Sequence, residues 1–210
     1  MSTGPRSSSD QLAYGTLVIE YDERVLRPRP WTTHQADWGA ELLDDAPPGP
    51  VLELCAGAGQ IGLLTVASSP RDLVCVDVDP AACEFARRNA DTNGMGHRVE
   101  IRCGDLRDVL RPEERFAFVV ADPPYLGPED VARYPEDPLV AIDGGPDGLV
   151  VAWSCVDVVG RHLMPGGRAL LQLQDVDQAH RIRDGLAARA LALTDYRTRG
   201  RGLIALLERT

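Results

Sequence analysis

The sequence predicts an α/β fold, with a mainly parallel sheet covered by helices on both faces. Short apolar runs alternate with helix-like stretches from residue 51 onward, as in repeated βαβ units. A glycine-rich turn follows the first of these runs, at Gly57–Gly62. The last two apolar runs are joined only by residues 197–202. That connection is too short for a crossover helix, so this pair is expected to be antiparallel.

The chain of 210 residues suits one domain. Residues 1–11 are polar and turn-rich, so we expect a disordered tail ahead of a single domain over 12–210. A β-like piece follows at 14–21, an extended segment at 27–31 and a helix at 32–43. Strands are expected at 51–54, 73–77, 99–103, 116–121, 168–173, 191–196 and 203–208. Helices are expected at 59–68, 80–93, 149–163 and 176–190, with a long Pro/Gly-rich loop over 123–147.

Composition limits the class of protein. Without a membrane-length apolar run or a signal-peptide pattern, the sequence predicts a soluble cytoplasmic protein. The net charge of −10 argues against a broad nucleic-acid footprint, because such binding neutralises phosphates with basic side chains. The five cysteines include no C-x-x-C pair, and no histidine stands at metal-ligand spacing to them. They are interpreted as structural thiols, and no metal site is expected.

The turn Gly57-Ala58-Gly59-Gln60-Ile61-Gly62 matches G-x-G-x-x-G, a pattern typical of dinucleotide-binding loops. Glu53 precedes it within the strand and would repel a pyrophosphate, whereas it suits a ligand with an ammonium or sulfonium charge. The alternative for Glu53 is a solvated carboxylate at the strand end. The neighbouring residues therefore have to decide which ligand the loop holds.

Two further acids follow the next strands. Asp77 ends the second strand, where it suits hydrogen bonds to ribose hydroxyls, while Asp79 before Pro80 is interpreted as a helix N-cap. Asp105 after the third strand would accept from the adenine amine and Leu106 would cover the ring, with a turn-capping carboxylate as the alternative. Together these residues favour S-adenosylmethionine over a nicotinamide dinucleotide. Gly57 and Gly59 then allow close backbone approach to that ligand, and Gly62 packs helix on strand or is coincidental.

The fourth strand ends in Asp122-Pro123-Pro124-Tyr125. The prolines stiffen this turn and remove two N–H donors, Asp122 adds an acceptor, and Tyr125 adds a flat face. Such a set can hold an NH₂ group by its hydrogens and aim its lone pair at a methyl carbon, so that positioning supplies much of the catalysis. A rigid turn without catalytic function is the alternative.

These motifs, in this order, resemble those of class I S-adenosylmethionine-dependent N-methyltransferases. The segment Ala141-Ile142-Asp143-Gly144-Gly145-Pro146-Asp147-Gly148-Leu149 and the segment Pro28-Arg29-Pro30-Trp31-Thr32 are similar to segments of the HemK-like protein-glutamine N-methyltransferases. The resemblance covers residue 26 to the end. It implies a Rossmann-like three-layer sandwich with a seven-stranded, mostly parallel sheet and an antiparallel C-terminal strand.

The same resemblance implies site residues. Cofactor contacts are expected at Thr32, Glu53, Cys55, Gly57, Gly59, Asp77, Asp105, Leu106 and Asp122. The target nitrogen is expected at Asp122, Pro123 and Tyr125. The sequence departs from the family in having Asp122 where glutamine methyltransferases carry Asn. It also has only about 25 residues before the P-R-P segment, where the release-factor enzymes have a substrate-docking domain.

We therefore expect an S-adenosylmethionine-dependent N-methyltransferase acting on a protein side chain or a small metabolite. An RNA or DNA base amino-methyltransferase is the alternative enzyme, and the net charge argues against it. Two other functions are considered, a non-catalytic S-adenosylmethionine-binding module and a nicotinamide oxidoreductase. No membrane association is expected, and the oligomeric state is not encoded in any motif.

Overall fold

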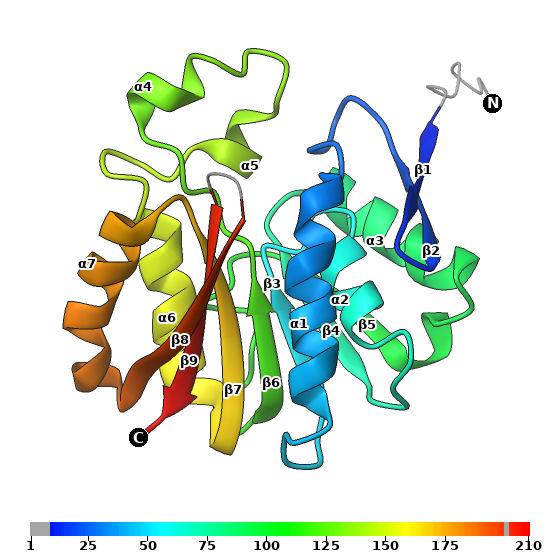
Figure 1. Ribbon diagram of the computed structural model, residues 1–210. Helices are drawn as coiled ribbons and strands as arrows, with labels where there is room; N and C mark the ends of the chain where they lie inside the picture. Colours follow the sequence, from blue (N-terminus) through cyan, green and yellow to red (C-terminus); the bar gives the residue numbers. More distant parts are fainter. Residues whose placement is uncertain (1–8, 200–201) are drawn as a thin grey trace.

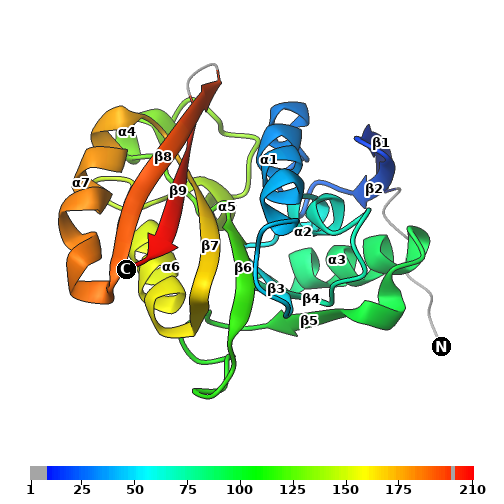
Figure 2. The ribbon, with the colours of Figure 1, turned by 60° about the horizontal axis from the view of Figure 1, so that its bottom comes forward.

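A seven-stranded sheet forms the centre of the computed structural model, which describes residues 9–199 and 202–210. Its strand order is β5-β4-β3-β6-β7-β9-β8. The strands are β3 (Val51–Leu54), β4 (Leu73–Asp77), β5 (Val99–Cys103), β6 (Phe116–Ala121), β7 (Leu163–Leu173), β8 (Leu191–Arg199) and β9 (Gly202–Arg209). The strands β3 to β7 are parallel, and β9 lies between β7 and β8, antiparallel to both (Figure 2). The predicted sheet and its closing antiparallel pair are confirmed.

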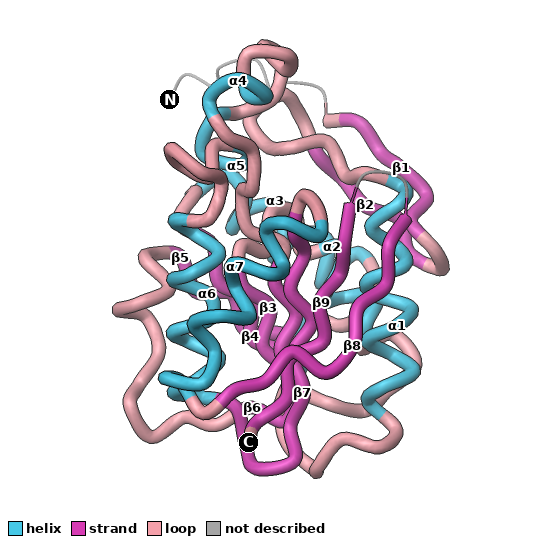
Figure 3. The backbone as a smooth tube through the Cα atoms, turned by 60° about the vertical axis from the view of Figure 1, so that its left-hand side comes forward, coloured by secondary structure: helices cyan, strands magenta, loops and turns pink. Residues whose placement is uncertain are grey.

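Helices cover both faces of this sheet, so the fold has three layers (Figures 1 and 3). The helices α1 (Thr33–Leu43), α2 (Gln60–Thr65) and α3 (Pro80–Thr92) share one buried apolar cluster with one face of the sheet. The helices α6 (Val150–His162) and α7 (Val176–Leu186) share a second cluster with the other face. Short 3-10 turns stand at η1 (Pro30–Thr32), η2 (Gly96–Arg98) and η3 (Ala187–Arg189).

The central strands are mainly apolar because both of their faces are covered. Every residue of β3 and of β6 is buried, which explains why apart from Glu53 the sequence shows apolar residues there instead of alternation. Along β3, Leu52 and Leu54 pack toward α6, while Val51 packs toward α1 and α2. The core therefore lies in two slabs, one on each side of the sheet.

The N-terminal segment differs from the prediction. In place of one β-like piece at 14–21, the structure has a hairpin of β1 (Asp10–Tyr14) and β2 (Leu17–Tyr21). Asp10 and Gln11 of the predicted tail belong to β1, and residues 1–8 of that tail lie outside the described residues. The hairpin docks on α3, where Asn89 accepts from Glu20 N at 2.8 Å and donates to its carbonyl at 3.0 Å. The Asn89 side-chain amide thus makes the hydrogen bonds to the β2 backbone that a neighbouring strand would otherwise make. Local sequence patterns do not reveal this contact.

Two short helices interrupt the segment predicted as loop over 123–147. They are α4 (Pro128–Val131) and α5 (Leu139–Ile142), and they lie beyond the sheet at the top of Figure 1. The strand predicted at 168–173 is also longer, because β7 begins at Leu163. The other predicted helices and strands are present, with ends shifted by a few residues.

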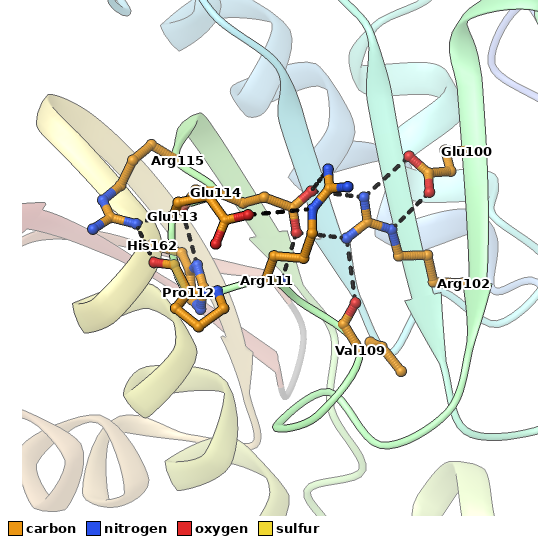
Figure 4. Close-up of polar contacts among 9 residues, drawn as sticks. All are labelled: Glu100, Arg102, Val109, Arg111, Pro112, Glu113, Glu114, Arg115 and His162. Atoms are coloured by element: carbon orange, nitrogen blue, oxygen red, sulfur yellow. Dashed lines mark hydrogen bonds and ion pairs between the residues drawn. The ribbon is translucent and has the colours of Figure 1, made fainter.

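A charged network at the sheet edge fixes the loop between β5 and β6 (Figure 4). Arg102 of β5 donates to both Glu114 oxygens at 2.8 Å and to the Val109 carbonyl at 3.3 Å. Glu100 and Arg111 complete the network through Arg102 and Glu114. Because Val109 and Glu114 lie in one loop, Arg102 holds that loop, which also carries Asp105 and Leu106, against the strand.

Candidate active site

Two cavities lie at the carboxyl ends of the parallel strands and meet at Asp122. The first, of about 490 Å³, is lined mainly by the segments that follow β3, β4 and β5. The second, of about 630 Å³, lies between the turn after β6 and the segment around η1. Both volumes are in the range of small-molecule sites. The residues that line both cavities are Leu26, Asp122, Pro124 and Ala141.

The glycine loop opens onto the first cavity at Gly57. Its φ is +54°, and an added Cβ would meet nothing nearer than the Gln60 side-chain oxygen, at 3.9 Å. The Gly57 amide donates to the Asp77 carboxylate at 2.7 Å. Cys55 lines the same cavity with a φ of +57°, and its thiol lies 3.9 Å from that of Cys155. The backbone at Cys55 and Gly57 is thus exposed to the first cavity.

The other two glycines of the pattern serve packing. Gly59 does not line the cavity, and a Cβ there would lie 3.2 Å from the Cβ of Ala86 in α3, so the expected ligand clearance at Gly59 is corrected to clearance for a helix. At Gly62 a Cβ would lie 2.4 Å from the Glu53 carboxylate. The interpretation of Gly62 as a helix–strand packing residue is confirmed. One sequence pattern therefore combines three different spatial requirements.

Glu53 lies behind the loop and not in the cavity. Its side chain is on the α2 side of β3, only 2% of the residue is exposed, and its carboxylate accepts from Gly62 N at 2.8 Å. Burial raises the pKa of Glu53 to about 7. Glu53 lines neither cavity, so the expectation that it faces the cofactor's positive charge does not agree with its position. Because both faces of β3 are buried, the sequence did not show which way this side chain points.

Other carboxylates make the first cavity acidic. Asp77 accepts from Gly57 N and, at 2.9 Å, from Asp79 N, and burial raises its pKa. Asp79 accepts from Ala81 N at 2.8 Å, which confirms it as the N-cap of α3. The described acidic residues that line the cavity are Asp77, Asp79, Asp105, Asp122 and Asp143, against Arg107 as the one basic residue. This charge balance favours a cationic ligand over a pyrophosphate.

Asp105 and Leu106, the predicted adenine contacts, line the first cavity from the loop after β5. Arg107 N donates to Asp105 at 2.9 Å and the Arg107 guanidinium pairs with it at 2.5 Å. These contacts, from the guanidinium first, lower the pKa of Asp105 to about 2. The carboxylate is therefore ionised and stands at the wall as a hydrogen-bond acceptor.

The turn Asp122–Tyr125 separates the two cavities. No described residue makes a hydrogen bond to the Asp122 carboxylate, and burial raises its pKa to about 7. Pro123 and Tyr125 line the second cavity, and burial also raises the pKa of the Tyr125 phenol. The predicted acceptor residues are thus brought together on one short turn.

The segment after α5 supports this turn from outside. The amide of Leu126 donates to the Ile142 carbonyl at 3.1 Å, and Gly144 N donates to the Leu126 carbonyl at 2.9 Å. Gln178 of α7 donates to the Tyr125 carbonyl at 3.0 Å. A Cβ at Gly148 would lie 2.2 Å from that same carbonyl. The glycines of this segment therefore let it pack directly on the backbone of the turn.

Thr32 belongs to the second cavity and not to the first. Its hydroxyl lies 2.6 Å from the Tyr14 phenol oxygen and donates to the Arg29 carbonyl at 2.8 Å. The sequence predicts a cofactor contact at Thr32, whereas in the structure Thr32 lines the second cavity. Trp31, Tyr125 and Tyr134 add aromatic groups to this cavity.

Comparison with known proteins places this chain in a family. Residues 31–134 match the methyltransferase small domain. The release factor glutamine methyltransferase of Moorella thermoacetica is 32% identical over 90% of this chain and 70% of its own length. The chain belongs to the class I S-adenosylmethionine-dependent methyltransferases, in the HemK-like family.

Other members of this family match a smaller share of their length. The release factor glutamine methyltransferase of Mycolicibacterium smegmatis is 34% identical over 81% of this chain and 61% of its own. The ribosomal protein uL3 glutamine methyltransferase of Bradyrhizobium diazoefficiens is 33% identical over 75% of this chain. The chain spans 53–61% of these two relatives.

Solved methyltransferase structures share the fold. A methyltransferase from Pyrococcus furiosus superposes with a TM-score of 0.68 at 22% identity, over 93% of this chain and 89% of that one. The two chains thus share a fold over nearly the whole length of this chain.

Two glutamines beside the cavities were not predicted from the sequence as candidate site residues. Gln60 follows the glycine loop and lines the first cavity, and its side-chain oxygen is buried without a hydrogen-bond partner among the described residues. Gln35 of α1 is fully buried and donates to the Ala121 carbonyl at 3.0 Å, just before the Asp122 turn. Gln60 stands at a variable position of the Gly57–Gly62 pattern and Gln35 lies outside the quoted motifs, so only their surroundings reveal them.

Two further findings concern metals and membranes. Within residues 9–199 and 202–210, no cluster of three or more His, Cys, Asp or Glu side chains is arranged to hold a metal ion. Over the same residues, no helix is both long and apolar enough to span a bilayer.

Proposed function

We propose that this chain is an S-adenosylmethionine-dependent N-methyltransferase that modifies an amide or amine nitrogen of a protein side chain. The observation that supports it is the position of Asp122, which lines both cavities. One cavity would hold the methyl donor and the other the acceptor, with the Asp122–Tyr125 turn between them. A transfer between two bound molecules needs such a shared boundary.

The first cavity fits S-adenosylmethionine by its shape and charge. Cys55 and Gly57 expose backbone, Asp77 would accept from the ribose hydroxyls, and Asp105 with Leu106 would hold the adenine. The surplus of aspartates suits a ligand that carries ammonium and sulfonium charges. When bound, S-adenosylmethionine supplies an activated methyl group on a sulfonium.

The turn would hold the acceptor nitrogen. Asp122 can accept from one N–H of the acceptor. Because Pro123 and Pro124 have no N–H, these two residues cannot donate to the backbone carbonyls beside them. Tyr125 would give a wall for the acceptor, and Gln178 keeps its backbone in place. The chain's contribution is therefore orientation of the nitrogen and exclusion of water.

A protein is the proposed substrate because the relatives are named for proteins. The relatives are named for a release factor and for ribosomal protein uL3, which supports a reaction in the cytoplasm. Exposed apolar side chains also surround the cavities: Val78, Leu139, Val140 and Val150 at the first, and Trp31 and Tyr134 at the second. Such a rim suits a macromolecular substrate.

Calorimetric titration with S-adenosylmethionine and with NAD tests the donor assignment. We expect binding of S-adenosylmethionine and none of NAD, and the opposite result would refute the proposal. Label transfer from methyl-labelled S-adenosylmethionine to a total protein extract then tests the reaction. Asp122→Ala should keep donor binding and lose about 100-fold or more in transfer, as for a lost positioning or proton-accepting group.

The matched control is Asp157→Asn, which removes an aspartate on α6 that pairs with Arg189 outside both cavities. It should transfer label at the rate of the unmodified protein. Equal transfer by Asp122→Ala and Asp157→Asn would show that the turn does not hold the acceptor.

A further inference from the structure

Three aspartates line the second cavity, which is proposed to hold the acceptor, and one of their carboxylates has no partner among the described residues. Asp137 is paired with Arg29. Asp130 accepts from the Gln174 amide at 2.8 Å and pairs with Arg133 at 2.9 Å. The carboxylate of the third, Asp122, has no hydrogen-bond or ion-pair partner among the described residues.

The partly buried carboxylate of Asp122, which has no partner among the described residues, favours a ligand with positive charge. An ionised carboxylate is only an acceptor, and burying it without a partner is costly. A cation beside it removes that cost and adds a charge-assisted hydrogen bond. A neutral amide can donate one N–H to Asp122. The carbonyl oxygen of that amide would receive no hydrogen bond from the Asp122 carboxylate and would be repelled by its negative charge. An asparagine in the same place would donate to that carbonyl.

The walls of the cavity suit a cationic group on an alkyl stem. Leu26, Pro123 and Ile142 contribute apolar surface, and Trp31 and Tyr134 are aromatic and partly exposed at the rim. Aromatic faces attract ammonium groups, and apolar walls cover the methylene stem of a side chain such as lysine.

We propose that the acceptor is the ε-ammonium of a lysine side chain on a partner protein, and not a glutamine amide. This inference rests on the proposed N-methyltransferase function and narrows its substrate. It assigns to Asp122 both the recognition of the charge and the removal of the proton.

The proton has to leave before methylation. An ammonium has no lone pair, so one N–H proton moves to the Asp122 carboxylate, and the freed lone pair forms the N–C bond. The C–S bond of the sulfonium breaks, sulfur keeps its electron pair as the thioether S-adenosylhomocysteine, and Asp122 returns the proton to solvent. The pKa of Asp122, raised to about 7, lies roughly three units closer to that of lysine than an exposed aspartate's does.

The test labels a total protein extract with methyl-labelled S-adenosylmethionine and then hydrolyses the protein in acid. Methyl-lysine survives hydrolysis, whereas methylated glutamine amide releases volatile methylamine. The chain contains no lysine, so labelled methyl-lysine cannot come from the enzyme itself. We expect roughly tenfold or more label in methyl-lysine over methylamine, as for a hydrogen bond to a charged group.

The variant Asp122→Asn should lose at least about 100-fold of the methyl-lysine label, while Asp157→Asn keeps it. Label mainly in methylamine, methyl-arginine or nucleic acid overturns the inference and leaves N-methyl transfer standing. No transfer by the unmodified protein, or label on oxygen or carbon alone, instead refutes the proposed function.

A second measurement on the unmodified protein does not depend on any variant. n-Butylamine and butyramide, which differ in the charge of their polar end, are compared as inhibitors of the labelling. The ammonium should inhibit at a concentration roughly tenfold lower than the amide. Equal inhibition, or stronger inhibition by butyramide, overturns the lysine assignment.

Discussion

The contact between Gly62 and Glu53 makes a sharp prediction for stability. In Gly62→Ala the new Cβ would lie 2.4 Å from Glu53 Oε2 and 2.8 Å from its Cδ, so the buried carboxyl group must move. Glycine to alanine in a helix normally stabilises by about 1 kcal/mol. Here overpacking costs about 1–3 kcal/mol, and weakening the hydrogen bond between Glu53 and Gly62 N costs a further 1–3 kcal/mol or so.

We therefore expect Gly62→Ala to lower the free energy of unfolding by about 3 kcal/mol. Urea unfolding followed by tryptophan fluorescence measures it. Gly127→Ala is the matched control, because a Cβ there meets nothing within 4 Å and its φ is −78°. That variant should stay within about 0.5 kcal/mol of the unmodified protein.

A double-mutant cycle tests the cause. Glu53→Asp withdraws the carboxylate by one methylene, so Gly62→Ala should cost at least about 1 kcal/mol less in that background. The reasoning fails if Gly62→Ala is as stable as the unmodified protein, or if its cost is the same with either acid at position 53.

Two further predictions concern acids of the strand ends. The pKa of Glu53 is raised from 4.5 to about 7 in the folded chain, so the folded state loses stability as pH rises through this window. Glu53→Gln removes this pH dependence. The free energy of unfolding of the variant, relative to that of the unmodified protein, should therefore rise by about 2 kcal/mol from pH 5 to pH 8. A difference between the two proteins that does not change with pH would contradict the burial of the Glu53 carboxyl group. Asp77→Ala should weaken S-adenosylmethionine binding by roughly tenfold or more, as measured by calorimetry, whereas Asp79→Ala should keep that affinity and lose about 1 kcal/mol of stability as a missing cap. Equal affinity of Asp77→Ala and the unmodified protein would refute the ribose assignment.

Much of the fold was predictable because it depends on local patterns. The apolar runs at 51–54, 73–77, 99–103 and 116–121 are strands within those limits. The cap at Asp79 followed from an Asp-Pro pair, which needs no knowledge of the rest of the molecule. The order of motifs along the chain also predicted which strand ends would meet, since parallel strands bring their carboxyl ends to one edge.

The hairpin and the supports of the site were not predictable in this way. Asn89 of α3 connects Glu20 of the hairpin with the Ala58 carbonyl of the glycine loop, and these partners lie 69 and 31 residues away. Gln178 reaches Tyr125 across 53 residues. Such contacts follow from packing between elements and leave no periodic trace in either segment.

By itself, the sequence determined the alternation of strands and helices, the closing antiparallel pair and the motifs that follow the strand ends. Only the tertiary structure decided the role of each residue within them. It placed the Glu53 side chain against Gly62 of α2, gave Gly57, Gly59 and Gly62 three different neighbours, and placed Asp122 between two cavities. The physical reason is that a strand covered on both faces has mostly apolar side chains on both. Its sequence therefore identifies the strand but does not show to which face a polar residue points.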